Sequence, residues 1–269
     1  MVKKMMPNIL SEIFESRKKS LNEQIKSFPS LETGVLDNGR NTLSEAIKAS
    51  NGISIISEIK PASPSQGDIR KEMNITEIAK SMEVAGVIGL SVLTEPNYFN
   101  GSFLNLYLAL KETTIPCLMK DFVFSEYQFK IARDIGATNI LLINLLGNLE
   151  KMYELALEFN LEPLIEIHDI TEINDLIYLR ETGINPPLIG VNNRNLKTLK
   201  VDLNTSKLLI PKIKELFSDK VTVISESGIS THDDVKFLQS CGADGFLIGS
   251  SIMQSNDIKQ KILYLRGIH

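Results

Sequence analysis

The feature of this chain that most constrains its fold is an alternation, from Gly52 onward, between short apolar runs and longer amphipathic stretches. The apolar runs are almost continuous in isoleucine, valine and leucine, which is typical of parallel strands that are covered on both faces. Eight such runs occur: Ile53–Ile59, Ile88–Leu93, Ile115–Met119, Asn139–Ile143, Pro163–Ile167, Leu188–Val191, Val221–Ser225 and Gly245–Ile248.

The stretches between these runs carry apolar residues at steps of three and four, as helices do. Examples are Ile75–Ala85, Glu126–Ile135, Leu149–Phe159 and Asp233–Cys241, several of them followed by a glycine that is suited to end a helix. Eight strand–helix units predict an α/β fold of the closed (β/α)8 type, a TIM barrel. The alternative is a doubly wound open sheet, but the segment Glu58–Pro64 after the first strand is not the glycine-rich loop of that fold.

Residues 1–51 precede the eight units. We predict one structural domain overall, in which 1–51 form a helical extension packed on the barrel and 52–269 form the barrel itself. The segment Ile9–Phe28 has the pattern of one helix, and Thr42 with Glu45 has the spacing of a capping box for a second helix that ends at Ala49. These helices either cover the lower face or the side of the barrel, or border its upper rim and close over a substrate.

Composition and charge narrow the possible partners. The formal net charge is −4 and the charged residues are interspersed, so we expect no nucleic-acid partner. No stretch approaches the roughly 20 apolar residues that cross a bilayer, and the segment Met1–Leu10 lacks the apolar run of a signal peptide. Cys117 and Cys241 lie in apolar surroundings without metal-ligand spacing, so we expect reduced thiols in a cytoplasmic protein. We also expect a monomer or a weak homodimer.

Polar residues stand where five of the apolar runs end, which is the edge of this fold that carries chemistry. Glu58 and Lys60 are two residues apart, so in an extended strand they project to the same face. Any one charged residue here can simply be leaving the core for water. The whole set resembles an acid–base site, because buried charges need partners or a ligand: Glu58, Lys60, Lys120, Glu166, Asn192 and Glu226.

The last two strand–helix turns predict a phosphate site. Ser227 and Gly228 follow the seventh apolar run, and Gly249 and Ser250 follow the eighth. Glycine lets backbone N–H groups approach a ligand closely, and these two loops form the usual phosphate cradle of a TIM barrel. Alternatively, both segments are ordinary tight turns between a strand and a helix, without a ligand.

The remaining motifs give no sign of a metal or of a nucleotide cofactor. His168, His232 and His269 share no metal-ligand spacing, and no GxSxG, HExxH or P-loop pattern occurs. We expect His168 and Asp169 to begin a helix, and Asp121 to cap a helix or form a turn.

The chain resembles the indole-3-glycerol-phosphate synthase family from about Ile9 to the last helix. The resemblance rests on segments that occur in the same order: Glu58–Ser65, Ser91–Ser102, Lys120–Phe122, Leu164–Ile167, Gly190–Leu196 and Glu226–Ile229. It implies a carboxy-lyase of tryptophan biosynthesis without a cofactor. The substrate would be 1-(2-carboxyphenylamino)-1-deoxyribulose 5-phosphate, and the products indole-3-glycerol phosphate, carbon dioxide and water.

The resemblance also implies roles for the residues of the site. Lys120 would be the general acid, Glu166 would assist dehydration, and Lys60 would neutralise the carboxylate or phosphate of the substrate. Glu58 would orient the lysines and the substrate hydroxyls. Asn192 would be a further catalytic residue, in a polar network with Arg194 and Glu226. Other residues would bind the substrate: Ser63, Arg194 and Glu226 in the polar part, Phe99 and the N-terminal segment around the aromatic ring, and Ser227, Gly228, Gly249 and Ser250 with Lys60 at the phosphate. We expect Lys60 and Lys120 to lower each other's pKa, since a lysine is a useful acid near neutral pH only with a lowered pKa.

Two other functions compete with this one. The first is that of phosphoribosylanthranilate isomerase, a related barrel that uses a cysteine and an aspartate, but Cys117 lies inside an apolar run and Glu58 stands where such a residue would be needed. The second is a metabolite-binding barrel that has kept a phosphate site without catalysis. Loss of a lysine or glutamate from the set would favour it, and none is lost.

Overall fold

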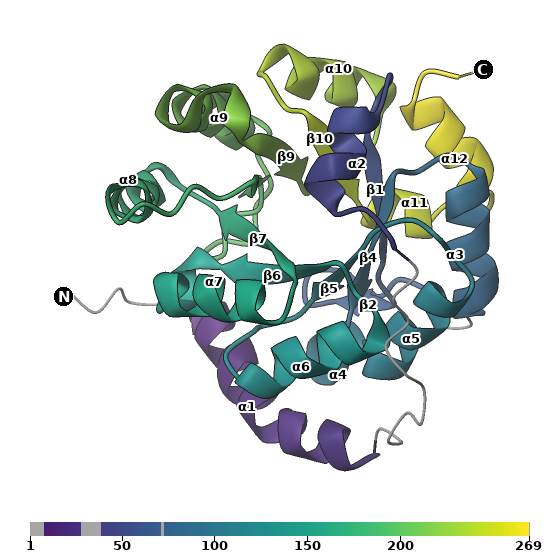
Figure 1. Ribbon diagram of the computed structural model, residues 1–269. Helices are drawn as coiled ribbons and strands as arrows, with labels where there is room; N and C mark the ends of the chain where they lie inside the picture. The colour runs from purple at the N-terminus through teal and green to yellow at the C-terminus, as the bar shows by residue number, and fades with distance from the viewer. Residues whose placement is uncertain (1–7, 28–38, 71–72, 269) are drawn as a thin grey trace.

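A computed structural model of the protein describes residues 8–27, 39–70 and 73–268. Eight parallel strands close into a barrel in the order β1-β10-β9-β8-β7-β6-β5-β4, which confirms the predicted TIM barrel (Figure 1). Each strand lies at one of the predicted apolar runs, and its ends differ from the prediction by two residues at most. The strands are β1 (Ile55–Ile59), β4 (Gly89–Leu93), β5 (Cys117–Lys120), β6 (Asn139–Ile143), β7 (Glu162–Ile167), β8 (Leu188–Asn192), β9 (Thr222–Glu226) and β10 (Gly245–Ile248).

Helices surround the barrel and connect its strands (Figure 1). The longer ones are α3 (Ile75–Val84), α5 (Phe103–Lys111), α6 (Glu126–Ile135), α7 (Leu149–Glu158), α8 (Ile173–Glu181), α9 (Asn204–Phe217), α10 (His232–Ser240) and α12 (Ile258–Leu265). Shorter elements lie in the connections: α4 (Pro96–Phe99), α11 (Ser250–Met253), the 3-10 turns η1 (Asn144–Leu146), η2 (Ile170–Glu172) and η3 (Ser218–Lys220), and the antiparallel pair β2 (Ala62–Ser63) and β3 (Gly67–Asp68). Within the described ranges, no helix combines the length and the apolar character needed to cross a membrane.

The barrel interior explains why charged residues gather at one end. One apolar cluster fills the interior with side chains such as Ile56, Leu118, Leu164 and Ile224. Successive side chains of a strand alternate between its faces, so the next inward position toward the carboxyl end lies two residues on. On β1, β5, β7 and β9 that position is occupied by Glu58, Lys120, Glu166 and Glu226.

The helix α2 (Leu43–Ala49) closes the opposite, amino-terminal end of the barrel. Its Leu43 and Ile47 belong to the interior cluster. The backbone N–H of Leu43 donates to Asn139 and that of Ser44 donates to Glu162, residues that begin β6 and β7. The predicted capping box is present, since Thr42 and Glu45 exchange side-chain hydrogen bonds with each other's backbone. The helix α2 therefore covers the core at the amino-terminal end of the barrel.

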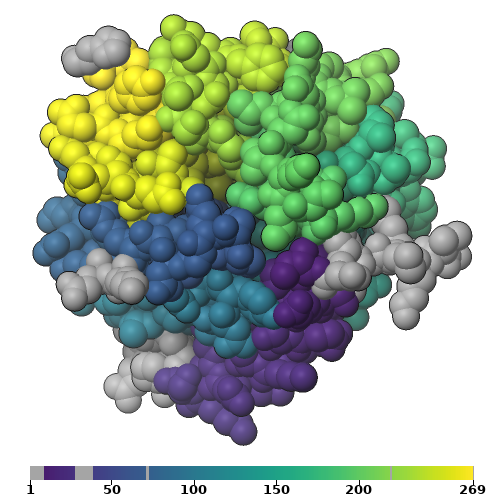
Figure 2. Space-filling view, turned by 180° about the vertical axis from the view of Figure 1, so that it is seen from behind, coloured from purple at the N-terminus to yellow at the C-terminus, as the bar shows by residue number. Residues whose placement is uncertain are grey.

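The helix α1 (Asn8–Ser27) lies beside α4 and extends toward the carboxyl-terminal end of the barrel (Figures 1 and 2). Its Ile9, Leu10 and Ile13 reach the pocket described below. Each of the two expected positions is therefore occupied by one helix. α2 covers the amino-terminal end of the barrel, and α1 borders the rim at the carboxyl-terminal end. The last residue of the helix predicted over Ile9–Phe28 lies outside the described residues, and the boundary at residues 51 and 52 stays a prediction.

Candidate active site

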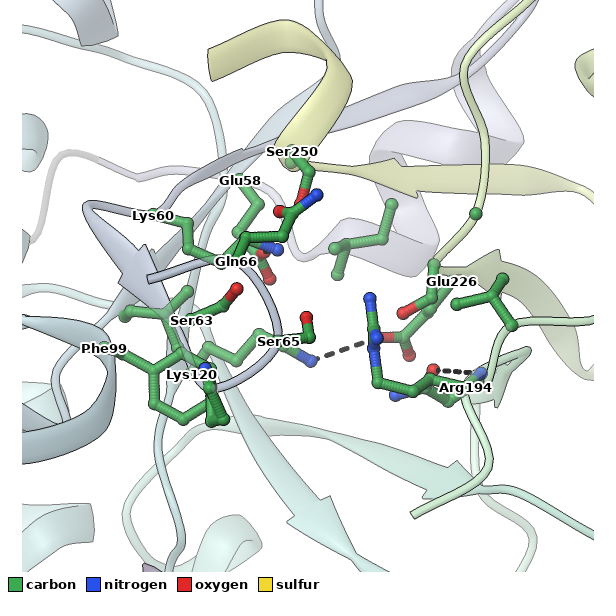
Figure 3. A pocket seen from close by; sticks show the side chains of 18 of the residues that line it. Glu58, Lys60, Ser63, Ser65, Gln66, Phe99, Lys120, Arg194, Glu226 and Ser250 are labelled. Atoms are coloured by element: carbon green, nitrogen blue, oxygen red, sulfur yellow. Dashed lines mark hydrogen bonds and ion pairs between the residues drawn. The ribbon is translucent and has the colours of Figure 1, made fainter. Parts of the chain in front are cut away.

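A pocket of about 360 Å³ opens at the carboxyl-terminal ends of the strands, within the size range of small-molecule sites. It lies on the face seen in Figure 2, where the N-terminal helix and segments from the rest of the chain meet around the barrel mouth. Every residue that the sequence assigned to the site lines it: Glu58, Lys60, Ser63, Phe99, Lys120, Glu166, Asn192, Arg194, Glu226, Ser227, Gly228, Gly249 and Ser250. The labelled side chains of Figure 3 come from different strands and loops and surround one space.

Lys120 is at the centre of the charged residues. Its Nζ lies 3.1 Å from Oε2 of Glu166 and 3.1 Å from Oε2 of Glu226. The carboxylates belong to β7 and β9, and their side chains are 4% and 1% exposed. Buried charges are tolerated when they are paired in this way. Lys60 forms a second pair, with its Nζ 2.7 Å from Oε1 of Glu58.

The expectation that Lys120 has a lowered pKa is wrong. Burial by itself lowers the pKa of Lys120, but the carboxylates of Glu166, Glu226 and Glu58 outweigh it and raise the pKa above its ordinary value. Lys60 contacts a carboxylate rather than Lys120. The side chain of Lys120 is therefore a protonated ammonium group in the pocket.

The pKa values of the two carboxyl groups beside Lys120 are shifted in opposite directions. Burial opposes ionisation of Glu166, yet the positive charges of Lys120 and His168 prevail and lower its pKa. Burial and the neighbouring Glu166 raise the pKa of Glu226 more than Lys120 lowers it. Two adjacent carboxyl groups commonly divide in this way, because ionisation of one disfavours ionisation of the other.

His168 is a residue of this cluster that sequence reasoning missed. We expected it to begin a helix, and Asp169 does cap the turn η2, but the ring of His168 lies between two carboxylates. Its Nε2 is 3.0 Å from Oε1 of Glu166, and its Nδ1 is 3.5 Å from Oε1 of Glu172. Burial lowers the pKa of His168, but the two carboxylates raise it to about 10. Its spacing of two from Glu166 at the end of a strand was the available signal.

Two glycines make room for the carboxylates. A Cβ added at Gly190 on β8 would lie 2.0 Å from Oε1 of Glu226. A Cβ added at Gly249, just after β10, would lie 2.5 Å from Oε1 of Glu58. Both distances are far inside van der Waals contact, so any larger residue at these positions would displace the acidic side chain.

The loops after β9 and β10 form one connected wall of the pocket. Ser227 and Gly228 have φ values of 69° and 84°, a left-handed conformation that costs Ser227 strain. The side-chain amide of Asn193 donates to the backbone carbonyls of Glu226 and Ser227 and holds them in place. The hydroxyl of Ser251 joins the two loops through a hydrogen bond of 2.8 Å to the carbonyl of Ile229. Further polar residues of the pocket were not predicted: Ser65, Gln66, Ser230, Ser251 and Gln254.

An apolar wall faces these polar loops. The rings of Phe99 and Phe122 are 6.1 Å apart, and Ile9, Leu10 and Ile13 of α1 complete the surface. The pocket thus combines an apolar side, suited to an aromatic ring, with a polar side that offers backbone N–H groups and hydroxyls to an anion.

Asp121, the neighbour of Lys120, does more than the turn or cap that we expected. Its carboxylate accepts a hydrogen bond from the backbone N–H of Phe122, as a turn residue would. It also forms a fully buried ion pair with Arg17 of α1. The helix that supplies part of the apolar wall is therefore attached directly beside Lys120.

The described residues show neither a metal-binding cluster nor a reactive thiol at Cys117. Within the described parts of the chain, no group of three His, Cys, Asp or Glu side chains is arranged to hold a metal ion. Cys117 is completely buried, and burial raises the pKa of its thiol to about 12. It is unsuited to the cysteine acid–base chemistry of the competing isomerase.

Comparisons with known proteins agree with the resemblance seen in the sequence. The family model described as indole-3-glycerol phosphate synthase matches residues 10–265. An indole-3-glycerol phosphate synthase of Methanocaldococcus jannaschii is 41% identical and aligns with 94% of this chain and 97% of its own. One from Bacillus cereus is 36% identical and aligns with 94% and 96%, respectively.

Solved structures show the same fold at low sequence identity. The tryptophan synthase alpha-subunit of Pyrococcus furiosus superposes with a TM-score of 0.61 at 15% identity, covering 80% of this chain and 98% of the subunit. The thiamine phosphate pyrophosphorylase of the same organism gives a TM-score of 0.56 at 18% identity, covering 84% and 96%. At such identities the likeness concerns the barrel alone.

Proposed function

The chain belongs to the indole-3-glycerol phosphate synthase family, and from this premise we propose that Lys120 is the general acid of its reaction. The reaction closes the indole ring of 1-(2-carboxyphenylamino)-1-deoxyribulose 5-phosphate and releases carbon dioxide and water, as a step of tryptophan biosynthesis. The observation that carries the assignment is the position of Lys120. Its ammonium group lies between two buried carboxyl groups, in a pocket with one apolar and one anion-binding side.

Substrate binding follows from the two sides of the pocket. The phosphate is bound by the loops of Ser227, Gly228, Gly249 and Ser250, and the aromatic ring lies against Phe99 and α1. Lys60 neutralises the carboxylate or the phosphate of the substrate, and Glu58 orients Lys60 through their ion pair. Ser63, Asn192, Arg194 and Glu226 bind the hydroxyls between these ends.

Ring closure is driven by proton transfer from Lys120. The ring carbon that bears the carboxylate attacks the ketone carbon, and the carbonyl oxygen takes the Lys120 proton as the new C–C bond forms. A lysine with a raised pKa gives up its proton only to a strongly basic oxygen, so the transfer accompanies the attack instead of preceding it. The electron pair of the C–CO2 bond then returns to the ring, and carbon dioxide leaves without a cofactor.

Dehydration completes the indole. The new hydroxyl leaves as water, and a proton leaves the neighbouring methylene carbon, whose C–H electron pair becomes the ring double bond. Glu166 takes part in this step as acid or base, since its carboxylate lies beside Lys120 in the pocket.

The assay uses the absence of tryptophan from the chain. The product is an indole, so its fluorescence rises over a background from tyrosine and phenylalanine alone. We expect turnover without added metal, a loss of several orders of magnitude in kcat for Lys120→Ala, and chiefly a raised KM for Lys60→Ala. The exposed lysine variant Lys212→Ala on α9 is the control and keeps both constants. Near-native kcat in Lys120→Ala would refute the assignment of the acid.

We further propose a monomer or weak homodimer that acts in the cytoplasm, and, because the net charge is −4 and the charged residues are interspersed, we expect no nucleic-acid partner. Sedimentation equilibrium tests the first part, and a tight dimer at nanomolar concentration would contradict it.

A further inference from the structure

His168 lies beyond the end of β7 and contacts Glu166, which lines the pocket. The two oxygens of Glu166 have different partners, with Lys120 on Oε2 at 3.1 Å and His168 on Oε1 at 3.0 Å. The side chain of His168 is 3% exposed. The ring is therefore placed to act on Glu166 and not on a bound substrate.

Glu172 of η2 holds the ring from its other side. Oε1 of Glu172 accepts hydrogen bonds from the backbone N–H groups of His168 and Asp169, at 2.8 and 3.3 Å, and lies 3.5 Å from Nδ1 of His168. Oε2 accepts from the side-chain amide of Asn144 at 2.9 Å, and this amide also donates to Asp175 of α8. These contacts fix Glu172, and through it the ring of His168.

The charges around His168 favour the imidazolium form. Glu166 on β7 and Glu172 on η2 face the ring directly, and both side chains are almost completely buried. On the far side of Glu166, Lys120 contacts Oε2 and not Oε1, so Oε1 of Glu166 and the carboxylate of Glu172 are left facing the ring of His168. If His168 were neutral, the part of the chain that the structure describes would offer Glu172 hydrogen bonds but no cationic side chain, and a buried carboxylate without an opposite charge is unfavourable. The raised pKa of His168, about 10, agrees with this argument.

We propose that His168 is a positioning residue for the reaction: held by Glu172 as an imidazolium, it fixes one oxygen of Glu166 and keeps this carboxylate ionised beside Lys120. Glu166 then enters the dehydration step as a base, which accepts the proton from the methylene carbon on its oxygen while the C–H pair forms the double bond. The catalytic part of this inference rests on the function proposed above. The charge and the position of His168 do not.

Nuclear magnetic resonance tests the charge without any turnover. The chain has three histidines, so ¹⁵N-imidazole signals of the intact protein can be assigned with His168→Gln and His232→Gln. We expect the signals of His168 to stay those of an imidazolium at pH 8, well above the ordinary histidine pKa of about 6.5. Titration of His168 near the ordinary value would overturn the proposal.

Kinetics tests the effect on Glu166. Glutamine keeps an amide donor but not the charge, so we expect His168→Gln to lower kcat at least about tenfold with KM changed less than about twofold. The acidic limb of its kcat profile moves up by about one to three pH units, as expected when a nearby positive charge is lost. His232→Gln, whose ring contacts the carbonyl of Leu265 away from the pocket, keeps the wild-type profile. An unshifted limb in His168→Gln refutes the proposal.

The experiments separate the two proposals and allow for a variant that does not fold. If His168→Gln is unfolded by circular dichroism, Glu172→Gln removes the anchor and is expected to shift the same limb, and an unshifted limb there again refutes the role. If wild-type protein does not convert the substrate, the proposed function fails, while the imidazole signals still decide the charge of His168.

Discussion

The buried ion pair between Arg17 and Asp121 makes a prediction that can be worked through from the structure. Nε of Arg17 donates to Oδ1 of Asp121 at 2.8 Å, and Nη2 donates to Oδ2 at 2.7 Å. Both side chains are 0% exposed. Asp121 also accepts hydrogen bonds from the hydroxyl of Thr94 at 2.7 Å and from the N–H of Phe122 at 2.8 Å. The pair attaches α1 to the barrel.

Replacement Arg17→Met removes the charge and keeps a long apolar side chain. Asp121 then loses two of its four donors and stays buried as an uncompensated carboxylate. Breaking a buried pair in this way costs about 3–5 kcal/mol, and the two remaining hydrogen bonds place the expected loss near the lower figure. Because the uncompensated charge of Asp121 causes most of the loss, adding Asp121→Asn to Arg17→Met should lower the free energy of unfolding little further. The coupling free energy between the two substitutions should be about 1–3 kcal/mol.

Urea unfolding followed by circular dichroism measures these free energies, and the indole assay measures KM in parallel. KM should rise in Arg17→Met, because α1 carries Ile9, Leu10 and Ile13 into the pocket. Arg133→Met on α6, whose guanidinium pairs with Asp134 at the surface, is the matched control and should change stability by at most about 0.5 kcal/mol. A loss below about 1 kcal/mol in Arg17→Met, or additive effects in the double variant, would refute the reasoning.

Three other predictions concern the pocket. Gly190→Ala should lower kcat about a hundredfold with little change in global stability, because its Cβ would push Glu226 out of place, and an unchanged kcat would show that the carboxylate has room to move. His168 has a folded-state pKa of about 10, raised above that of the unfolded chain, so its contribution to stability is complete below about pH 6.5 and is lost as the pH rises through 10. The difference in urea midpoint between wild type and His168→Gln should therefore shrink from pH 6.5 to pH 10, and a constant difference would contradict the charge. Amide hydrogen exchange in residues 61–70, measured with and without product, tests whether the β2–β3 segment is a lid, and equal protection in both states would exclude it.

Much of the architecture could be predicted from local patterns. Continuous apolar runs and helical periodicity depend on neighbours in the chain, so the strands and the capping box of Thr42 were found with their bounds nearly right. The site followed from the same patterns. Parallel strands bring their carboxyl ends to one edge, and Glu58, Lys120, Glu166 and Glu226 stand at those ends.

Only the tertiary structure decided how these groups influence one another. The sequence showed two lysines and suggested mutual repulsion, but the barrel places Lys120 between the carboxylates of Glu166 and Glu226. It also brings Arg17 to Asp121 across 104 positions of the chain. The charge of a buried group depends on distances of a few ångströms in a medium of low polarity. Those distances arise from the closure of the barrel, which joins residues that no local pattern relates.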